Sequence, residues 1–186
     1  FAAADGLALK MDSELGGSAI AGKQGPMYLT ADRIESTAPN IIEASGDVEA
    51  RQAGQNFFAN WLRYDTTLSL VEARGEVRLE QPALRVSGDS LKLNLNDYSG
   101  ELTQPVYQFV PPPGRGDAER VDFIDENHFK LQDATYTTCR RLPGPDWMPD
   151  WILRATTLSL DNEEEIGIAQ GAVLSSVGTG TNGSGV

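Results

Sequence analysis

The sequence has very little of the two residue types that most often build catalytic and metal sites. It contains one cysteine, Cys139, and one histidine, His128, among 186 residues. A single cysteine excludes a disulfide within the chain and the CxxC pairs of structural zinc and iron–sulfur sites. His128 has no second histidine or cysteine with which to share a metal, so we expect a solvated residue at a strand edge. The sequence therefore predicts no metal and no cofactor.

Long apolar runs and basic residues are also scarce. No stretch approaches the roughly 18 consecutive apolar residues of a membrane-spanning helix, and the opening FAAADGLALK lacks the features of a signal peptide. The 15 Lys and Arg residues face 27 Asp and Glu residues, which gives a net charge of −12. The chain should therefore repel nucleic acid. It should also repel phosphorylated lipid head groups, so any lipid contact is expected through acyl chains on apolar side chains.

No convincing helical period is present, whereas a strand-and-turn rhythm begins near Pro26. Short runs of alternating apolar and polar residues are separated by Gly, Asp, Asn and Pro at spacings of roughly ten residues. This rhythm predicts an all-β domain over residues 26–175. Residues 1–25, rich in Ala and Gly, are predicted to be a flexible leader, and residues 176–186, rich in Gly, Ser and Thr, a tail or linker.

An internal repeat lies within this domain. The segment EASGDVEARQAGQNFFANWLRYD, which starts at Glu43, aligns without a gap with EARGEVRLEQPALRVSGDSLKLN, which starts at Glu72, at a period of 29 residues. A period of this size is typical of stacked supersecondary units that are too thin to bury an apolar face alone. Weaker echoes follow in LTQPVYQF and LRATTLSLDNEEEIGIAQGAVL.

Strand parity within each repeat predicts one apolar and one charged face. The apolar faces of the outgoing strands carry Ala44, Gly46, Val48 and Ala50, and then Ala73, Gly75, Val77 and Leu79. The return strands contribute Phe58, Leu62 and Tyr64, and then Leu91, Leu93 and Leu95, with Ala59 and Gly88 permitting a bulge that changes the parity upstream. Stacked repeats align these faces into one strip. The pattern does not decide between a dry core and an open trough for chain-like ligands.

Several strings, in order along the chain, carry a family resemblance: YLTADRIE, IEASGDVEARQ, LRYD, VEARGEVRLEQ, RGDAERV, LQDATYTTC and WILRATTLSLD. Over residues 26–174 they resemble the N-terminal periplasmic domain of the lipopolysaccharide-assembly protein LptD. The EAxG(D/E)V strings are shared with the wider OstA-like group, which includes LptA. The string ending at Cys139 is similar to LptD in particular.

The resemblance implies a twisted β-jellyroll of stacked antiparallel strands, as in OstA and LptA, and a transport function without catalysis. It implies a soluble periplasmic domain of an outer-membrane protein, which receives lipopolysaccharide from LptA and passes its acyl chains to its own C-terminal β-barrel, plugged by LptE. By this analogy the lipid-contacting residues are Val48, Phe58, Leu62, Tyr64, Val77, Leu79, Leu91, Leu93 and Leu95.

Two further features follow from the resemblance. Joining two jellyrolls requires an exposed strand edge, and the predicted first strand, from Met27 to Glu35, is the candidate, with Tyr28, Leu29 and Ile34 as edge residues for β-strand augmentation by LptA. A covered start of the sheet is the alternative. In the family the cysteine of the TTC motif bridges to the barrel, so Cys139 is expected to form an interdomain disulfide in the full-length protein and a free thiol in this chain. From the residues alone it is a small buried residue.

Two rival functions remain open. A purely structural β-solenoid of the adhesin type should have a filled interior, and a carbohydrate-active β-helix enzyme should gather carboxylates on a concave face. No GxSxG nucleophile signature and no phosphate-binding glycine loop ahead of a helix is present. Trp147, Met148 and Trp151 either close one mouth of the jellyroll or form a packed loop.

Overall fold

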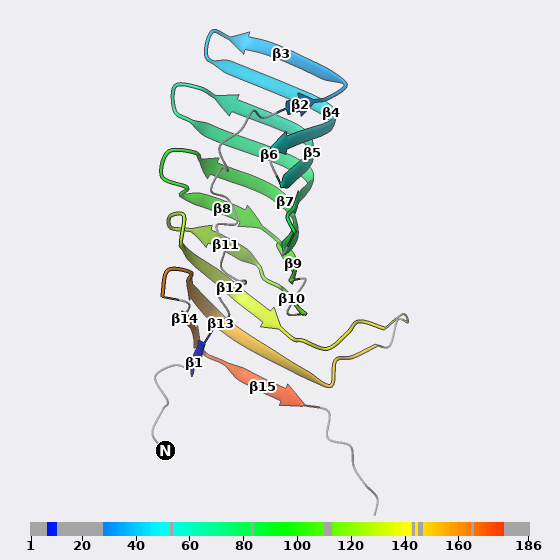
Figure 1. The fold of residues 1–186 in the computed structure, drawn as a ribbon, viewed down its shortest axis with the longest axis vertical. Coiled ribbons are helices and arrows are strands. Elements are labelled where there is room, and N and C mark those ends of the chain that lie inside the picture. Colours follow the sequence, from blue (N-terminus) through cyan, green and yellow to red (C-terminus); the bar gives the residue numbers. More distant parts are fainter. Residues whose placement is uncertain are drawn as a thin grey trace, which may run out of the picture.

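The computed structural model describes residues 7–10, 28–52, 54–82, 84–109, 113–142, 144, 147–164 and 166–176. These residues form a single 15-stranded antiparallel sheet, which confirms the predicted all-β class. The strands stack one above another in a single column, with β3 and β4 at one end and β15 at the other (Figure 1). The rest of the predicted leader and most of the predicted tail lie outside the described residues.

Short turns join most of the consecutive strands. Their bounds are β1 Leu7–Lys10, β2 Tyr28–Thr30, β3 Arg33–Ala38, β4 Ile41–Gln52, β5 Gln55–Asp65, β6 Leu70–Glu80, β7 Leu84–Asn94, β8 Gly100–Thr103, β9 Val106–Phe109, β10 Gly114–Asp117, β11 Arg120–Phe123, β12 His128–Tyr136, β13 Trp151–Asp161, β14 Ile166–Gln170 and β15 Val173–Ser176.

The hairpins are closed by side chains as well as by backbone. Between β5 and β6, the carboxylate of Asp65 accepts hydrogen bonds from the backbone N–H groups of Thr67 and Leu68, at 3.0 and 3.1 Å. This local pairing is why Asp and Asn favour turns over strand interiors. Asp97 and Asp161 do the same in later turns.

The repeat has a direct structural counterpart. Its two copies form the β4–β5 and β6–β7 hairpins, and the register of each hairpin shifts at the same place in the repeat, between Ser45 and Val48 and between Arg74 and Val77. The glycines inside these bulges, Gly46 and Gly75, have φ angles of +75° and +74°. Glycine adopts this backbone conformation at little cost, which explains why it recurs at this point of the repeat.

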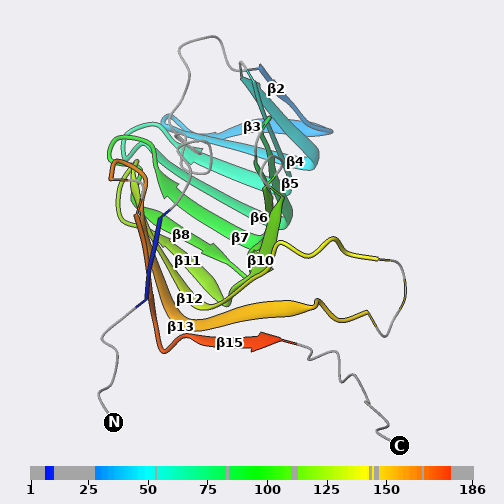
Figure 2. The ribbon, with the colours of Figure 1, turned by 60° about the horizontal axis from the view of Figure 1, so that its bottom comes forward.

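The bulges lie side by side in neighbouring strands and divide the sheet into two halves. Beyond β7 the division is complete, because β9 pairs with the first half of β7 and β8 with the second half. The strands bend along this line, so the two halves turn toward each other around a concave face (Figure 2). This bent stack of antiparallel strands is the predicted twisted jellyroll.

The buried apolar side chains gather on the concave face. A larger buried cluster spans β5 to β14 and includes Val77, Leu102 and Leu131; a smaller one at the other end contains Ala44, Val48 and Leu62. The convex face carries charged pairs such as Arg63–Glu72 at 3.1 Å and Arg120–Asp122 at 2.7 Å. Such partly exposed pairs add little stability, so burial of the apolar face holds the fold together.

One strand pairing was not anticipated from the sequence. Within the segment predicted as a leader, β1 pairs antiparallel with β14, with Leu7 opposite Ala169 and Lys10 opposite Ile166. The amino-terminal region therefore adds a strand to the C-terminal end of the sheet (Figure 1).

The short β9–β10 hairpin packs tightly against β12, which makes one glycine indispensable. A Cβ atom at Gly116 would overlap the carbonyl oxygen of Thr135 and meet the hydroxyl of Tyr107, which donates a hydrogen bond to that carbonyl. We expect Gly116→Ala to lower the free energy of unfolding by about 2–3 kcal/mol. Gly144→Ala, which meets nothing within 4 Å, should cost about 1 kcal/mol through its backbone conformation alone. Urea denaturation of both variants checks this; equal losses would contradict the packing.

Candidate functional site

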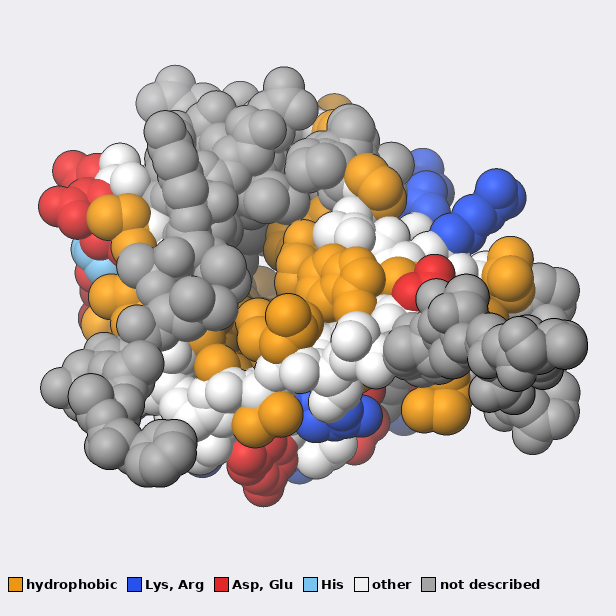
Figure 3. All heavy atoms as spheres, turned by 90° about the horizontal axis from the view of Figure 1, so that it is seen from below, with side chains coloured by type: hydrophobic (Ala, Val, Ile, Leu, Met, Phe, Trp, Pro, Cys, Tyr) orange, Lys and Arg blue, Asp and Glu red, His pale blue; other side chains and the backbone are white. Residues whose placement is uncertain are grey.

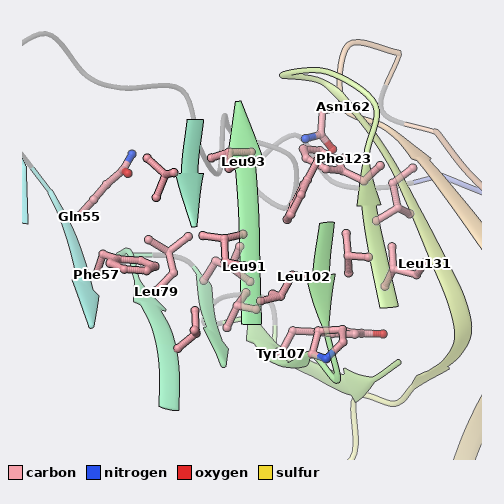
Figure 4. A pocket seen from close by; sticks show the side chains of 18 of the residues that line it. Gln55, Phe57, Leu79, Leu91, Leu93, Leu102, Tyr107, Phe123, Leu131 and Asn162 are labelled. Carbon is pink, nitrogen blue, oxygen red and sulfur yellow. The ribbon is translucent and has the colours of Figure 1, made fainter. Parts of the chain in front are cut away.

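An apolar cavity of about 690 Å³ occupies the concave face. From the β15 end, hydrophobic side chains are visible around a hollow in the molecule (Figure 3). In the close-up, Phe57, Leu79, Leu91, Leu93, Leu102 and Leu131 come from five strands and surround the same space (Figure 4). Its lining runs from Leu29 and Ile42 at one end of the stack to Leu160 and Gly167 at the other. The cavity is therefore a trough that follows the stacking direction.

Seven of the nine predicted lipid-contacting residues line this trough: Leu62, Tyr64, Val77, Leu79, Leu91, Leu93 and Leu95. Val48 is 1% exposed and packs in the smaller buried cluster instead of lining the trough. Its position is that of a supporting core residue. Whether the seven contact lipid stays a prediction, but the structure brings them together on one surface.

The prediction that Phe58 lies on the apolar face is wrong. Phe58 pairs with Arg78 on β6, and the Arg78 guanidinium lies 4.6 Å from the centroid of the Phe58 ring, outside the trough. Its neighbour Phe57 pairs with Leu79 and lines the trough. The register of β5 shifts between Phe58 and Trp61, so the residues before the shift exchange faces relative to Leu62.

A large part of the trough was missed by the sequence prediction. Its C-terminal half is lined by aromatic and aliphatic residues of β9 and β11–β13, among them Tyr107, Phe109, Phe123, Phe129, Leu131, Leu158 and Leu160. Phe123 and Phe129 pack edge to face at 5.8 Å. The alternating apolar residues of β12 and β13 were a usable signal, because Phe129 and Leu131, and Leu158 and Leu160, are each two positions apart.

The N-terminal edge of the sheet consists of two strands instead of the single predicted one. β2 and β3 pair with the two halves of β4. The strand is interrupted between them at Asp32, whose backbone N–H donates to the carbonyl of Gly46 at 2.9 Å. Within the described residues, neither strand pairs with a further strand on its other side. Of the predicted edge residues, Tyr28 is 66% and Ile34 48% exposed, whereas Leu29 lines the trough.

Cys139 lies just beyond β12 and is half-buried. Its backbone N–H donates to the hydroxyl of Thr137 at 3.1 Å, and its Sγ is 4.0 Å from the carbonyl oxygen of Trp151. The Thr137 hydroxyl is the main cause that lowers the pKa of the Cys139 thiol. A half-exposed thiol with a lowered pKa is more accessible to thiol–disulfide exchange than the buried residue expected from the residues alone.

Two tryptophans near the start of β13, Trp147 and Trp151, contact neighbouring strands and do not line the trough. The Arg115 guanidinium lies 5.8 Å from the Trp147 ring, and Trp151 packs against Tyr136 with ring centroids 6.0 Å apart. Met148 is 71% exposed. None of Trp147, Met148 and Trp151 belongs to the described trough lining, which favours the packed-loop alternative.

His128 joins two neighbouring hairpin turns. Its Nδ1 lies 2.8 Å from Asp125 Oδ1 and its Nε2 3.4 Å from Asp161 Oδ2. The hydrogen bond with Asp125 is the largest influence and raises the pKa of His128 above its ordinary 6.5. His128 therefore lies in an ion-pair network that the sequence did not suggest.

The raised pKa of His128 predicts a specific pH dependence. Because the folded state holds the proton more tightly, the stabilising contact is fully present below pH 6.5 and is lost as the pH rises through the folded pKa. An NMR titration of the sole histidine should give a midpoint above 6.5. Asp125→Asn should lower that midpoint. A midpoint at or below 6.5 in the unaltered chain would contradict the ion pair.

The described residues contain neither a metal-binding cluster nor a membrane-spanning helix. No group of three or more His, Cys, Asp or Glu side chains in this part of the chain could hold a metal ion. Nor does any helix in the described part have the length and hydropathy needed to cross a membrane. The trough lining contains no carboxylate among its described residues.

Comparison with known proteins assigns the chain to a family. No family model matches the sequence. The chain is 60% identical over 177 residues to the LPS-assembly protein LptD of Thiobacillus denitrificans, a match that covers 95% of this chain and 24% of that protein. It is 41% identical over 150 residues to LptD of Albidiferax ferrireducens, with 81% and 19% covered. The chain belongs to the LptD family.

The chain corresponds to the N-terminal domain of LptD and spans about a fifth to a quarter of the length of the LptD relatives it matches. The resemblance inferred from the EAxG(D/E)V and TTC strings is thereby confirmed. A solved structure of LptH from Pseudomonas aeruginosa, described as the LptA-homologous periplasmic component of the lipopolysaccharide transport device, shares 13% identity. That match covers 89% of this chain and 92% of the other, with a TM-score of 0.32, which is too low to support an inference.

Proposed function

We propose that this LptD-family domain carries lipopolysaccharide during outer-membrane assembly by holding its acyl chains in the apolar trough. The observation that carries the proposal is the 690 Å³ cavity on the concave face, lined almost entirely by apolar side chains. Burial of apolar surface contributes about 25 cal/mol per Å², which is enough to hold several acyl chains without hydrogen bonds or ion pairs. The net charge of −12 disfavours contact with phosphorylated head groups, so these remain in water.

The lipid requirement can be tested by binding measurements on the purified chain. We expect intact lipopolysaccharide to bind and the same lipopolysaccharide, chemically deacylated, not to bind, because only the acyl chains match the trough. Isothermal titration calorimetry measures both. Equal binding of the two forms would show recognition of the sugar or phosphate groups and would overturn the proposal. Absence of binding by intact lipopolysaccharide would instead favour a structural module with a closed core.

The proposal extends to the partners and location of the longer protein. The domain would lie in the periplasm, receive lipopolysaccharide from LptA at the β2–β3 edge, and pass it to a C-terminal barrel associated with LptE. Cys139 would bridge to that barrel. The exposed backbone edge of β2 and β3 supports the LptA step, because such an edge can extend a partner's sheet.

The edge proposal has a matched control at the opposite end of the sheet. A photo-crosslinking residue at Tyr28, which is 66% exposed, should capture LptA, whereas the same residue at Leu174 on β15, which is 67% exposed, should not. Capture at Leu174 alone would place the LptA contact at the other end. Capture at both positions would indicate non-specific association.

A further inference from the structure

Among the carboxamide side chains that line the trough, one makes no hydrogen bond to the described protein. Two carboxamides line the cavity, and they lie on opposite sides of it, at Gln55 and Asn162 (Figure 4). Gln55 interacts with neighbouring protein groups. The side chain of Asn162 has no hydrogen bond or ion pair to any described residue, and only its backbone N–H donates a hydrogen bond within the described part of the chain.

Asn162 is held firmly at this place. It follows β13 in the turn that leads to β14, at the rim of the trough, and its backbone N–H donates to the carbonyl of Asn127 in the neighbouring turn at 2.9 Å. Asn127 in turn donates to Asp125 at 2.9 Å. The two turns are further joined by His128, which contacts both Asp125 and Asp161.

The residue next to Asn162 fixes the turn itself. Asp161 Oδ1 accepts hydrogen bonds from the backbone N–H groups of Glu163 and Glu164, at 3.0 and 2.9 Å. The backbone on both sides of Asn162 is thus fixed by interactions that leave its carboxamide free. A polar group held in place beside an apolar surface is what a site for an amphiphilic ligand requires.

We infer that Asn162 binds the carbonyl linkage of a lipid whose acyl chains occupy the trough. An amide linkage offers an oxygen to the Asn162 Nδ2 donor and an N–H to its Oδ1 acceptor; an ester offers the oxygen alone. A hydrocarbon in the same place would exclude water from the carboxamide without replacing its hydrogen bonds, and an ether offers only a weakly accepting oxygen and no N–H group. The site therefore prefers amide-linked acyl chains, and it fixes how deep the lipid lies. This inference rests on the proposed lipid-binding function.

A matched pair of single-chain lipids tests the inference. The two have saturated chains of equal length and neutral polar ends; one carries an acyl amide and the other an ether in its place. The unaltered chain should bind the amide lipid about threefold to tenfold more tightly than the ether lipid, the gain from one or two hydrogen bonds at a half-exposed rim. Displacement of an apolar fluorophore measures both dissociation constants.

Two variants at Asn162 separate the carboxamide from general folding. Asn162→Ala removes the group without adding bulk, and Asn162→Leu replaces it with an apolar side chain. Both should bind the two lipids with equal affinity, and their affinity for the ether lipid should be unchanged or higher. Asn96→Ala, in the exposed β7–β8 turn outside the trough lining, should keep the preference of the unaltered chain.

The outcomes separate this inference from the proposed function. Equal binding of both lipids by the unaltered chain, or a preference that persists in Asn162→Ala, overturns the role of Asn162 and leaves the trough intact as a lipid site. Binding of neither lipid by the unaltered chain contradicts the proposed function together with the inference. Loss of the preference in both Asn162 variants, with ether-lipid binding retained, supports it.

Discussion

Leu91→Trp should lower the affinity for lipopolysaccharide by roughly tenfold or more while the domain stays folded. Leu91 lines the middle of the trough and its side chain is directed into it (Figure 4). A tenfold loss corresponds to about 1.4 kcal/mol, or roughly 55 Å² of apolar contact at about 25 cal/mol per Å². An indole ring buries about 150–250 Å², so it can displace more acyl-chain contact than this threshold. The cavity accommodates the larger side chain, which is why the fold survives.

The adjacent residue supplies the control for the filled trough. Lys92 is exposed on the opposite face of the same strand, so Lys92→Trp adds the same side chain outside the cavity. Its affinity for lipopolysaccharide should equal that of the unaltered chain. If calorimetry shows equal losses in both variants, the added indole acts through something other than occupation of the trough. If neither variant loses affinity, the acyl chains lie elsewhere.

Leu93→Asn should lower the free energy of unfolding by about 3–5 kcal/mol, because it removes buried apolar surface and places an unpaired amide in the trough wall. Leu93 is 5% exposed. Small domains have total stabilities of roughly 5–15 kcal/mol, so this single change would remove a large part of the total. Guanidinium denaturation followed by the fluorescence of the three tryptophans measures the loss.

Lys92→Asn is the matched control, since it introduces the same amide on the exposed face and should change stability by no more than about 0.5 kcal/mol. A small effect of Leu93→Asn would mean that water reaches this part of the trough wall and satisfies the new amide. The trough would then be a wet channel, and the hydrophobic drive assigned to acyl-chain binding would be much weaker.

The parts of the fold that the sequence predicted are those whose signal is local. The 29-residue repeat identifies the β4–β5 and β6–β7 hairpins, and the alternation within it places Leu62, Val77, Leu91 and Leu93 on one face. The bulge that Ala59 was expected to permit lies between Phe58 and Trp61. These features depend on residues a few positions apart, so they can be recognised without a structure.

The predictions that were wrong or missing concern features that depend on pairing with another strand. The face of Phe58 depends on where β5 shifts its register against β6, and the backbone of Gly75 and Glu76 in β6 helps to set that position. The four-residue strands β8 to β11 are too short to show a period. The pairing of β1 with β14 joins segments near opposite ends of the sequence, so no local pattern predicts it.

Two neighbouring phenylalanines that point to opposite faces can show whether acyl chains lie on the concave face. A photo-reactive phenylalanine analogue is placed at Phe57, inside the trough, or at Phe58, under Arg78 on the convex face, and each protein is irradiated with lipopolysaccharide. We expect capture of lipopolysaccharide at Phe57 and none at Phe58. Capture at Phe58 alone, or no capture at Phe57 in a folded protein, would contradict this expectation.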